Sequence, residues 1–169
     1  QNFPAAMFKI GSLYFEGKYI EHNIDKAIQF YQLAAKQDYI DAIFRLAILY
    51  YEGKYINRDI NKAIHYFALT AERNNPEAQF NLGLIYENGK YVPRNIEKAI
   101  HYYSLASDQN HAQAQFNLGL IFDEGYFVEK NIEKALHYYF LAAKQNHPEA
   151  QLNIGLIYYE GKDVSQNIN

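Results

Sequence analysis

Apolar residues along this chain recur at helical spacing. Between residues 77 and 112, the first apolar group is Ala78, Leu82, Ile85 and Tyr86, whose separations place them on one face of a helix. A second group follows on another helical face: Ile96, Ala99, Ile100, Tyr103, Ala106 and Ser107. The alternation with a period of two that is typical of a strand is absent. This segment therefore predicts two helices.

Residues that favour helix ends lie at the expected places in this segment. Pro76 suits a first turn, and Gly89 can end the first helix in a left-handed conformation. Asn95 stands where an N-cap belongs, and Asn110 tolerates a left-handed conformation after the second helix. The residues equivalent to Asn110 are Asp38, Asn74 and Asn146.

The same pattern returns every 36 residues along the chain. The glycine after the first helix recurs as Gly17, Gly53, Gly89, Gly125 and Gly161, and an alanine of the second helix recurs as Ala27, Ala63, Ala99 and Ala135. A strict period of this length is typical of solenoids, in which each unit buries its apolar face only by stacking on its neighbours. The chain is therefore predicted to be a single repeat domain, and packing between its helices places much of its aromatic content in the core.

The predicted fold is all-α, with about four and a half repeats of antiparallel helix pairs. First helices are expected near 5–16, 41–52, 77–88, 113–124 and 149–160. Second helices are expected near 23–37, 59–73, 95–109 and 131–145. The units are 5–40, 41–76, 77–112, 113–148 and a partial 149–169, all within one domain covering 1–169. Because the sequence stops at 167–169, where a fifth second helix should start, we expect a piece of a longer protein.

Small residues are also in phase within the first helices. The series is Gly11, Ala47, Gly83, Gly119 and Gly155. Small side chains let two helix axes approach closely. We expect a second series to fill the space beside them: Tyr14, Tyr50, Tyr86, Phe122 and Tyr158.

The run Leu82-Gly83-Leu84-Ile85-Tyr86 matches the first-helix pattern of a tetratricopeptide repeat, and Ala99 with Tyr103 matches its second-helix pattern. The loop between these patterns is longer than in that family. With this longer loop the chain resembles the Sel-one-like repeat, and the stretches 76–83 and 148–155 resemble it closely. The resemblance covers the whole chain. It implies a right-handed α/α superhelix, with the first helices on the concave side, that serves as a protein-interaction adaptor.

One polar stripe of the first helices is the main candidate for binding. Asn81, Asn117 and Asn153 are in register, and an asparagine amide can both donate to and accept from a peptide backbone. The alternative is that they are ordinary solvated positions or caps on neighbouring helices. The candidate concave stripe consists of Arg45, Ile48, Glu52, Asn81, Leu84, Asn88, Asn117, Leu120, Glu124, Asn153, Leu156 and Glu160. Its glutamates slightly favour a protein or peptide partner with basic residues.

A second candidate is the edge formed by the loops after the first helices. The loop-edge residues are Tyr19, Lys54, Tyr55, Lys90, Tyr91, Arg94 and Phe127. Basic residues among aromatic ones can bind phosphate or nucleic acid. Alternatively, the lysine stems lie over the rings while their charges stay solvated. A formal net charge of −3 favours the second interpretation, so no nucleic-acid partner is expected.

The sequence gives no sign of catalysis, of a metal or of a cofactor. It has no cysteine and no pair of histidines at helical spacing for zinc, and His65, His101 and His137 are expected to be exposed and too far apart to share a metal. No phosphate loop or nucleophile motif occurs. The branch of the family associated with β-lactams carries cysteine pairs that this chain lacks. An enzyme is therefore not expected.

These observations predict a non-catalytic protein-interaction scaffold, with a regulatory or assembly array of a larger multidomain protein as the alternative. No apolar run is long enough to cross a membrane, and the absence of cysteine favours a reducing, cytoplasmic location. The last first helix, Glu149–Glu160, lacks the apolar cover that a second helix would give Ile154, Ile157 and Tyr158. We therefore expect weak end-to-end self-association there.

Overall fold

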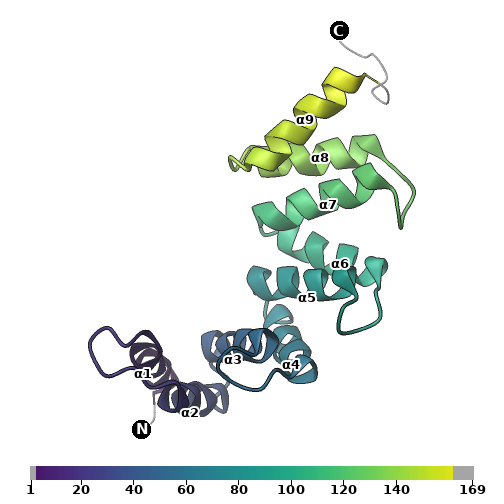
Figure 1. The fold of residues 1–169 in the computed structure, drawn as a ribbon. Coiled ribbons are helices and arrows are strands. Elements are labelled where there is room, and N and C mark those ends of the chain that lie inside the picture. The colour runs from purple at the N-terminus through teal and green to yellow at the C-terminus, as the bar shows by residue number, and fades with distance from the viewer. Residues whose placement is uncertain (1–2, 162–169) are drawn as a thin grey trace. The chain divides into compact units, whose positions relative to one another are not determined.

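The computed structural model describes residues 3–161, and this part of the chain is entirely helical (Figure 1). Its nine helices are α1 (Pro4–Glu16), α2 (Ile24–Ala35), α3 (Ile40–Glu52), α4 (Ile60–Ala71), α5 (Pro76–Asn88), α6 (Ile96–Ser107), α7 (Ala112–Glu124), α8 (Ile132–Ala143) and α9 (Pro148–Glu160). The predicted all-α fold of first and second helices is confirmed within the described residues. The expected start of a fifth second helix, at 167–169, lies outside them.

The second helices end two residues earlier than the sequence predicted. After Ala35, for example, the backbone N–H groups of Gln37 and Asp38 donate to carbonyls three residues back, at 3.0 and 2.9 Å. This tighter turn leads into Asp38, whose φ is +60°. The predicted left-handed residues are confirmed in every repeat: Asp38, Asn74, Asn110 and Asn146.

Contacts divide the chain into two compact units, residues 1–78 and 79–169. In the first unit α1 packs on α2, α2 on α3 and α3 on α4. In the second unit α6 packs on α7, α7 on α8 and α8 on α9. Each unit is described by itself below, and the expectation of one continuous domain stays a prediction.

An asparagine or aspartate begins each second helix. The side chains of Asn23, Asp59, Asn95 and Asn131 accept a hydrogen bond from the backbone N–H three residues later, at 2.8–3.0 Å. This confirms the predicted N-cap at Asn95. The first helices end at left-handed glycines, as expected. At Gly89, with φ +63°, an added Cβ would lie 2.7 Å from the Cβ of Arg94, so a larger residue fits neither the conformation nor the space.

The small residues of the first helices lie against rings of the second helices. A Cβ added at Gly83 would lie 2.5 Å from the ring of Tyr103, and one added at Gly119 would overlap the ring of Tyr139. Both tyrosines are fully buried. The series expected to fill this space lies to the side instead. Tyr86, for example, is half-buried and stacks on Tyr102 with ring centroids 5.9 Å apart.

A lysine covers each of these stacked pairs. The ammonium of Lys98 lies 4.8 Å from the ring centroid of Tyr86, and Lys62 lies 5.0 Å from that of Tyr50, which stacks on Tyr66. The same arrangement occurs with Lys26 over Tyr14 and with Lys134 over Phe122. Such cation–π contacts at partly exposed sites stabilise by about 0.5–1 kcal/mol each. They explain why the lysine series of the second helices recurs with the repeat.

We predict that Gly83→Ala lowers the free energy of unfolding by about 1–3 kcal/mol, because the new methyl group would overlap the buried ring of Tyr103. Gly155→Ala is the matched control at the equivalent position of α9, where nothing lies within 4 Å of an added Cβ. The control should be neutral or stabilising, since alanine favours helix over glycine. Urea unfolding of both variants measures the difference. Equal stability of the two would contradict the close approach.

We predict that the free energy of unfolding of the first unit depends on pH through Asp59. The backbone N–H of Lys62 holds the pKa of Asp59 below its usual value. Because the folded-state pKa is the lower one, this carboxylate stabilises the fold above its unfolded pKa of about 3.9, and the contribution is lost as the pH falls through the folded value.

Asp59→Asn keeps the cap without the titration, as Asn95 does in α6. The difference in unfolding free energy between Asp59→Asn and the unaltered chain should therefore change between about pH 5 and pH 2.5. If the unfolding free energies of the two proteins change in parallel with pH, the charge of Asp59 contributes nothing to the stability of the cap.

Candidate protein-interaction surface

The candidate concave stripe is only partly exposed. Arg45, Glu52, Asn88, Glu124 and Leu156 are exposed. The half-buried members are Ile48, Asn81, Leu84, Leu120 and Asn153, and Asn117 is buried. The side chain of Glu160 lies outside the described part of the chain. The surface that a partner can reach is therefore formed mainly by the charged and polar residues toward the C-terminal ends of the first helices.

Asn117 belongs to a buried hydrogen-bond network in the second unit. Its Nδ2 donates to the hydroxyl of Tyr103 at 3.0 Å, and its Oδ1 accepts from Nε2 of Gln113 at 3.1 Å. The Tyr103 hydroxyl in turn donates to Oε2 of Glu87 at 2.6 Å. This network connects the second helix α6 to both neighbouring first helices, α5 and α7.

Asn153 has the same kind of partner one repeat further on. It hydrogen-bonds to the hydroxyl of Tyr139, which donates to Oδ2 of Asp123 at 3.2 Å. Burial raises the pKa of Tyr139 well above its usual value, although the bond with Asn153 acts in the opposite direction. The hydroxyl therefore stays a neutral donor. Direct binding of a partner by these asparagines stays a prediction, and within the second unit they also join helices.

Glu87 and Asp123, which accept hydrogen bonds from the tyrosine hydroxyls, were not among the predicted site residues. An acid stands at this position only in the third and fourth repeats, because its equivalents in the others are Phe15, Tyr51 and Tyr159. The hydroxyl of Tyr31 in the first repeat donates to Oγ of Ser12 instead, at 3.3 Å. In the second repeat the buried ring is Phe67, which has no hydroxyl. Tyr51 instead meets Phe67 edge to face, with centroids 6.2 Å apart.

At the loop edge, the cations lie over the aromatic rings. Distances from nitrogen to ring centroid are 4.9 Å for Lys54 over Tyr55 and 5.1 Å for Lys90 over Tyr91. A hydrogen bond with the Tyr55 hydroxyl also raises the pKa of Lys54. The guanidinium carbon of Arg94 lies 4.8 Å from the centroid of Phe127. The charged groups themselves therefore lie over the rings, and binding at the loop edge stays a prediction.

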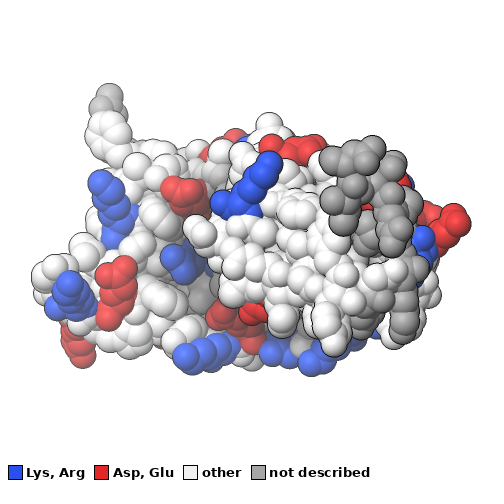
Figure 2. Space-filling view, turned by 90° about the horizontal axis from the view of Figure 1, so that it is seen from above, with Lys and Arg blue, Asp and Glu red and all other residues white. Residues whose placement is uncertain are grey.

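Tyr19 is the most exposed of the aromatic loop-edge residues, at 74%. Lys18 lies 5.3 Å from its ring centroid. Basic and acidic side chains are interspersed over the face seen in Figure 2.

Five of the six histidines fall into two groups. His65, His101 and His137 are exposed, as predicted, and each ring contacts the next tyrosine. His111 and His147 have a role that the sequence did not suggest, because their Nδ1 atoms accept from the backbone N–H groups that begin α7 and α9, at 3.2 and 3.4 Å. Within residues 3–161, no three histidine, aspartate or glutamate side chains gather to hold a metal ion. The described helices include none that could span a membrane.

The fold and the repeated helix pairs define the class of α-helical repeat proteins. The Sel1 repeat matches residues 4–39, 40–75, 76–111, 112–147 and 148–169, and the chain belongs to the Sel1 repeat family. The matched units begin one residue before those predicted. Such repeats, also called Sel1-like or SLR repeats, generally mediate protein–protein interaction. Comparison with curated proteins gives no match.

Solved structures share this fold. A Sel1 repeat protein from Oxalobacter formigenes is 31% identical with a TM-score of 0.87, and the alignment covers 96% of this chain and 66% of that one. A protective antigen of uropathogenic Escherichia coli, with an SLR fold, is 26% identical with a TM-score of 0.90 and coverages of 94% and 34%. Cysteine-rich protein B of Helicobacter pylori is 29% identical with a TM-score of 0.58 and coverages of 79% and 96%. This chain thus spans less than two thirds of the first two proteins.

Proposed function

We propose that this chain is a non-catalytic adaptor that binds a peptide or a helix of a partner protein along the candidate concave stripe. The observation that carries the proposal is the Sel1 repeat in every unit, because this repeat generally mediates protein–protein interaction. The exposed members of the stripe supply charged and amide side chains, including Arg45, Glu52, Asn88 and Glu124. The acidic members favour a partner segment with basic residues.

The second candidate is a regulatory or assembly array within a larger polypeptide. It is favoured by the lengths of the similar structures, since this chain covers only 66% and 34% of the first two. Both candidates use the same physical property, which is an extended surface built from stacked helix pairs. The absence of cysteine keeps a reducing, cytoplasmic location part of the proposal.

We predict that peptides selected from a random display library against this chain depend on the stripe. Replacing Asn88 and Glu124 with alanine should weaken binding by about 0.5–1.5 kcal/mol for each lost hydrogen bond, with larger losses where a charged pair is removed. These two exposed residues are better probes than Asn117, whose replacement would also disturb the network around Tyr103. Affinities from calorimetry measure the effect.

The control variant is His101→Ala with His137→Ala, on the exposed side of the second helices, and thermal melts should show that all variants fold equally well. If binding is insensitive to the stripe but is lost on replacing Lys54, Lys90 and Arg94 with glutamate, the site lies at the loop edge. That result would contradict the proposed surface.

We also propose weak self-association through α9. Leu152, Leu156, Tyr158 and Tyr159 are exposed on this helix, whereas Ile154 and Ile157 are half-buried against residues of α8. An exposed apolar face of this kind favours association.

Sedimentation velocity at rising concentration should show dimers or longer assemblies, which Leu152→Ser with Tyr158→Ser should reduce. Leu33→Ser is the matched control, because Leu33 is an exposed leucine of α2. A monomer at every concentration, or an equal effect of the control, would contradict association through α9.

A further inference from the structure

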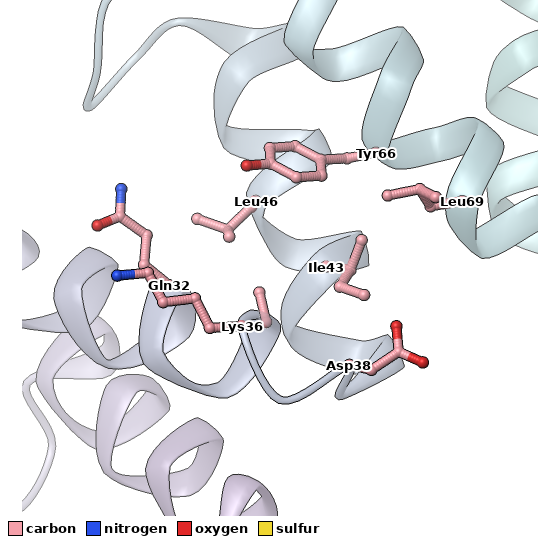
Figure 3. A pocket seen from close by; sticks show the side chains of 8 residues that line it. Gln32, Lys36, Asp38, Ile43, Leu46, Tyr66 and Leu69 are labelled. Atoms are coloured by element: carbon pink, nitrogen blue, oxygen red, sulfur yellow. The ribbon is translucent and has the colours of Figure 1, made fainter.

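A pocket of about 380 Å³ opens in the first unit between α2 and α4, the second helices of the first two repeats (Figure 3). Gln32 and Lys36 of α2 line one side, and Tyr66 and Leu69 of α4 line the other. Ile43 and Leu46 of α3 form the floor, and Ala35 and Asp38 complete the lining. The pocket therefore lies wholly within one unit and draws on three helices.

Ile43 and Arg73, both in the second repeat, explain why the pocket is open. In the second unit the position of Ile43 is held by Gln115, whose Nε2 donates to the Ser107 carbonyl at 3.2 Å. Its Oε1 accepts from Nε2 of Gln145 at 2.8 Å, so two glutamines bridge this place. In the first unit the position of Gln145 is held by Arg73, and Ile43 offers it no acceptor.

Arg73 forms its hydrogen bonds with Asp38 and with the backbone of Leu69 instead. Its Nη2 donates to both carboxylate oxygens of Asp38, and its Nη1 donates to the Leu69 carbonyl at 2.9 Å. The bridge of the second unit is thus replaced by an apolar floor and by a cation held at the rim. This pairing offsets part of the repulsion between the carboxylate of Asp38 and an acidic ligand.

Three polar groups at the rim remain available to a ligand. In the described part of the chain, no hydrogen bond or ion pair joins the Gln32 amide, the Lys36 ammonium or the Tyr66 hydroxyl to another residue. An apolar floor with a few convergent polar groups is the usual composition of a binding pocket. With Asp38 paired to Arg73, Lys36 leaves the rim with a net positive charge.

We propose that this pocket binds an acidic segment of a partner protein. An apolar side chain of the segment would lie on Ile43, Leu46 and Leu69, and a neighbouring carboxylate would pair with Lys36. Gln32 and Tyr66 can hydrogen-bond to the peptide backbone of such a segment. The inference goes beyond the adaptor function proposed above, because it adds a second site of opposite charge preference.

The two sites occupy different sides of α3. At about 100° per residue, Ile43 and Leu46 lie roughly opposite the stripe members Arg45, Ile48 and Glu52. A partner bound at one site therefore does not cover the other on this helix. A result that contradicts binding at the stripe can therefore be told apart from one that contradicts binding at the pocket.

The test follows the methyl NMR signals of Ile43, Leu46 and Leu69 while blocked dipeptides are added. Acetyl-Leu-Glu-amide should shift these signals at millimolar concentration and bind about three to five times more tightly at low salt than its neutral match, acetyl-Leu-Gln-amide. Lys36→Gln should remove this preference while leaving the affinity of the neutral peptide unchanged.

The double variant Ile43→Gln with Arg73→Gln imports the arrangement of the second unit and should abolish binding of both peptides, with its fold checked by thermal melting. Unmoved methyl signals, or a preference that survives Lys36→Gln, would overturn the proposal. Isocaproate carries the same isobutyl and carboxylate groups without peptide bonds. If it binds as tightly as the acidic peptide, the pocket takes a small acid and the inferred protein partner is wrong.

Discussion

Packing of a second-helix ring against a small residue of the preceding first helix holds each repeat together. Tyr103 lies over Gly83 and Tyr139 lies over Gly119 so closely that a single added methyl group would overlap the ring. The contact is apolar on the ring face, but each hydroxyl also needs a hydrogen-bond partner when it is buried. One interaction therefore places demands on several other positions in the repeat.

These demands account for the polar residues around the ring. Tyr103 receives a hydrogen bond from Asn117 and donates one to Glu87, so one hydroxyl is bonded to two first helices. In the second repeat the ring is Phe67, which has no hydroxyl, and the position of the acid there holds Tyr51. Polar residues that the sequence alone would place on the surface, such as Asn117, are therefore needed to hydrogen-bond a buried ring. Only the exposed members of the stripe are left for binding a partner.

Side chains that differ between equivalent positions of the repeats give individual repeats their own polar contacts and pockets. The second unit fills the space beside α7 with the pair Gln115 and Gln145, while Ile43 and Arg73 leave the corresponding space of the first unit open. Because a solenoid gives every repeat nearly the same backbone, a change of two side chains is enough to convert a bridged position into a pocket. The proposed acidic-peptide site follows from this difference between repeats.

The sequence by itself determined the helices, their order and their ends. The 36-residue period, the left-handed residues such as Gly89 and Asn110 and the cap at Asn95 depend on local backbone chemistry, which neighbouring residues reveal. Only the tertiary structure decided the partners of side chains far apart in the chain. Asn117 could equally face solvent or a ring on the previous helix, and nothing in its neighbours distinguishes the two. The pocket beside Ile43 also required three helices to be placed together, because its walls come from residues more than 30 positions apart along the chain, such as Gln32 and Tyr66.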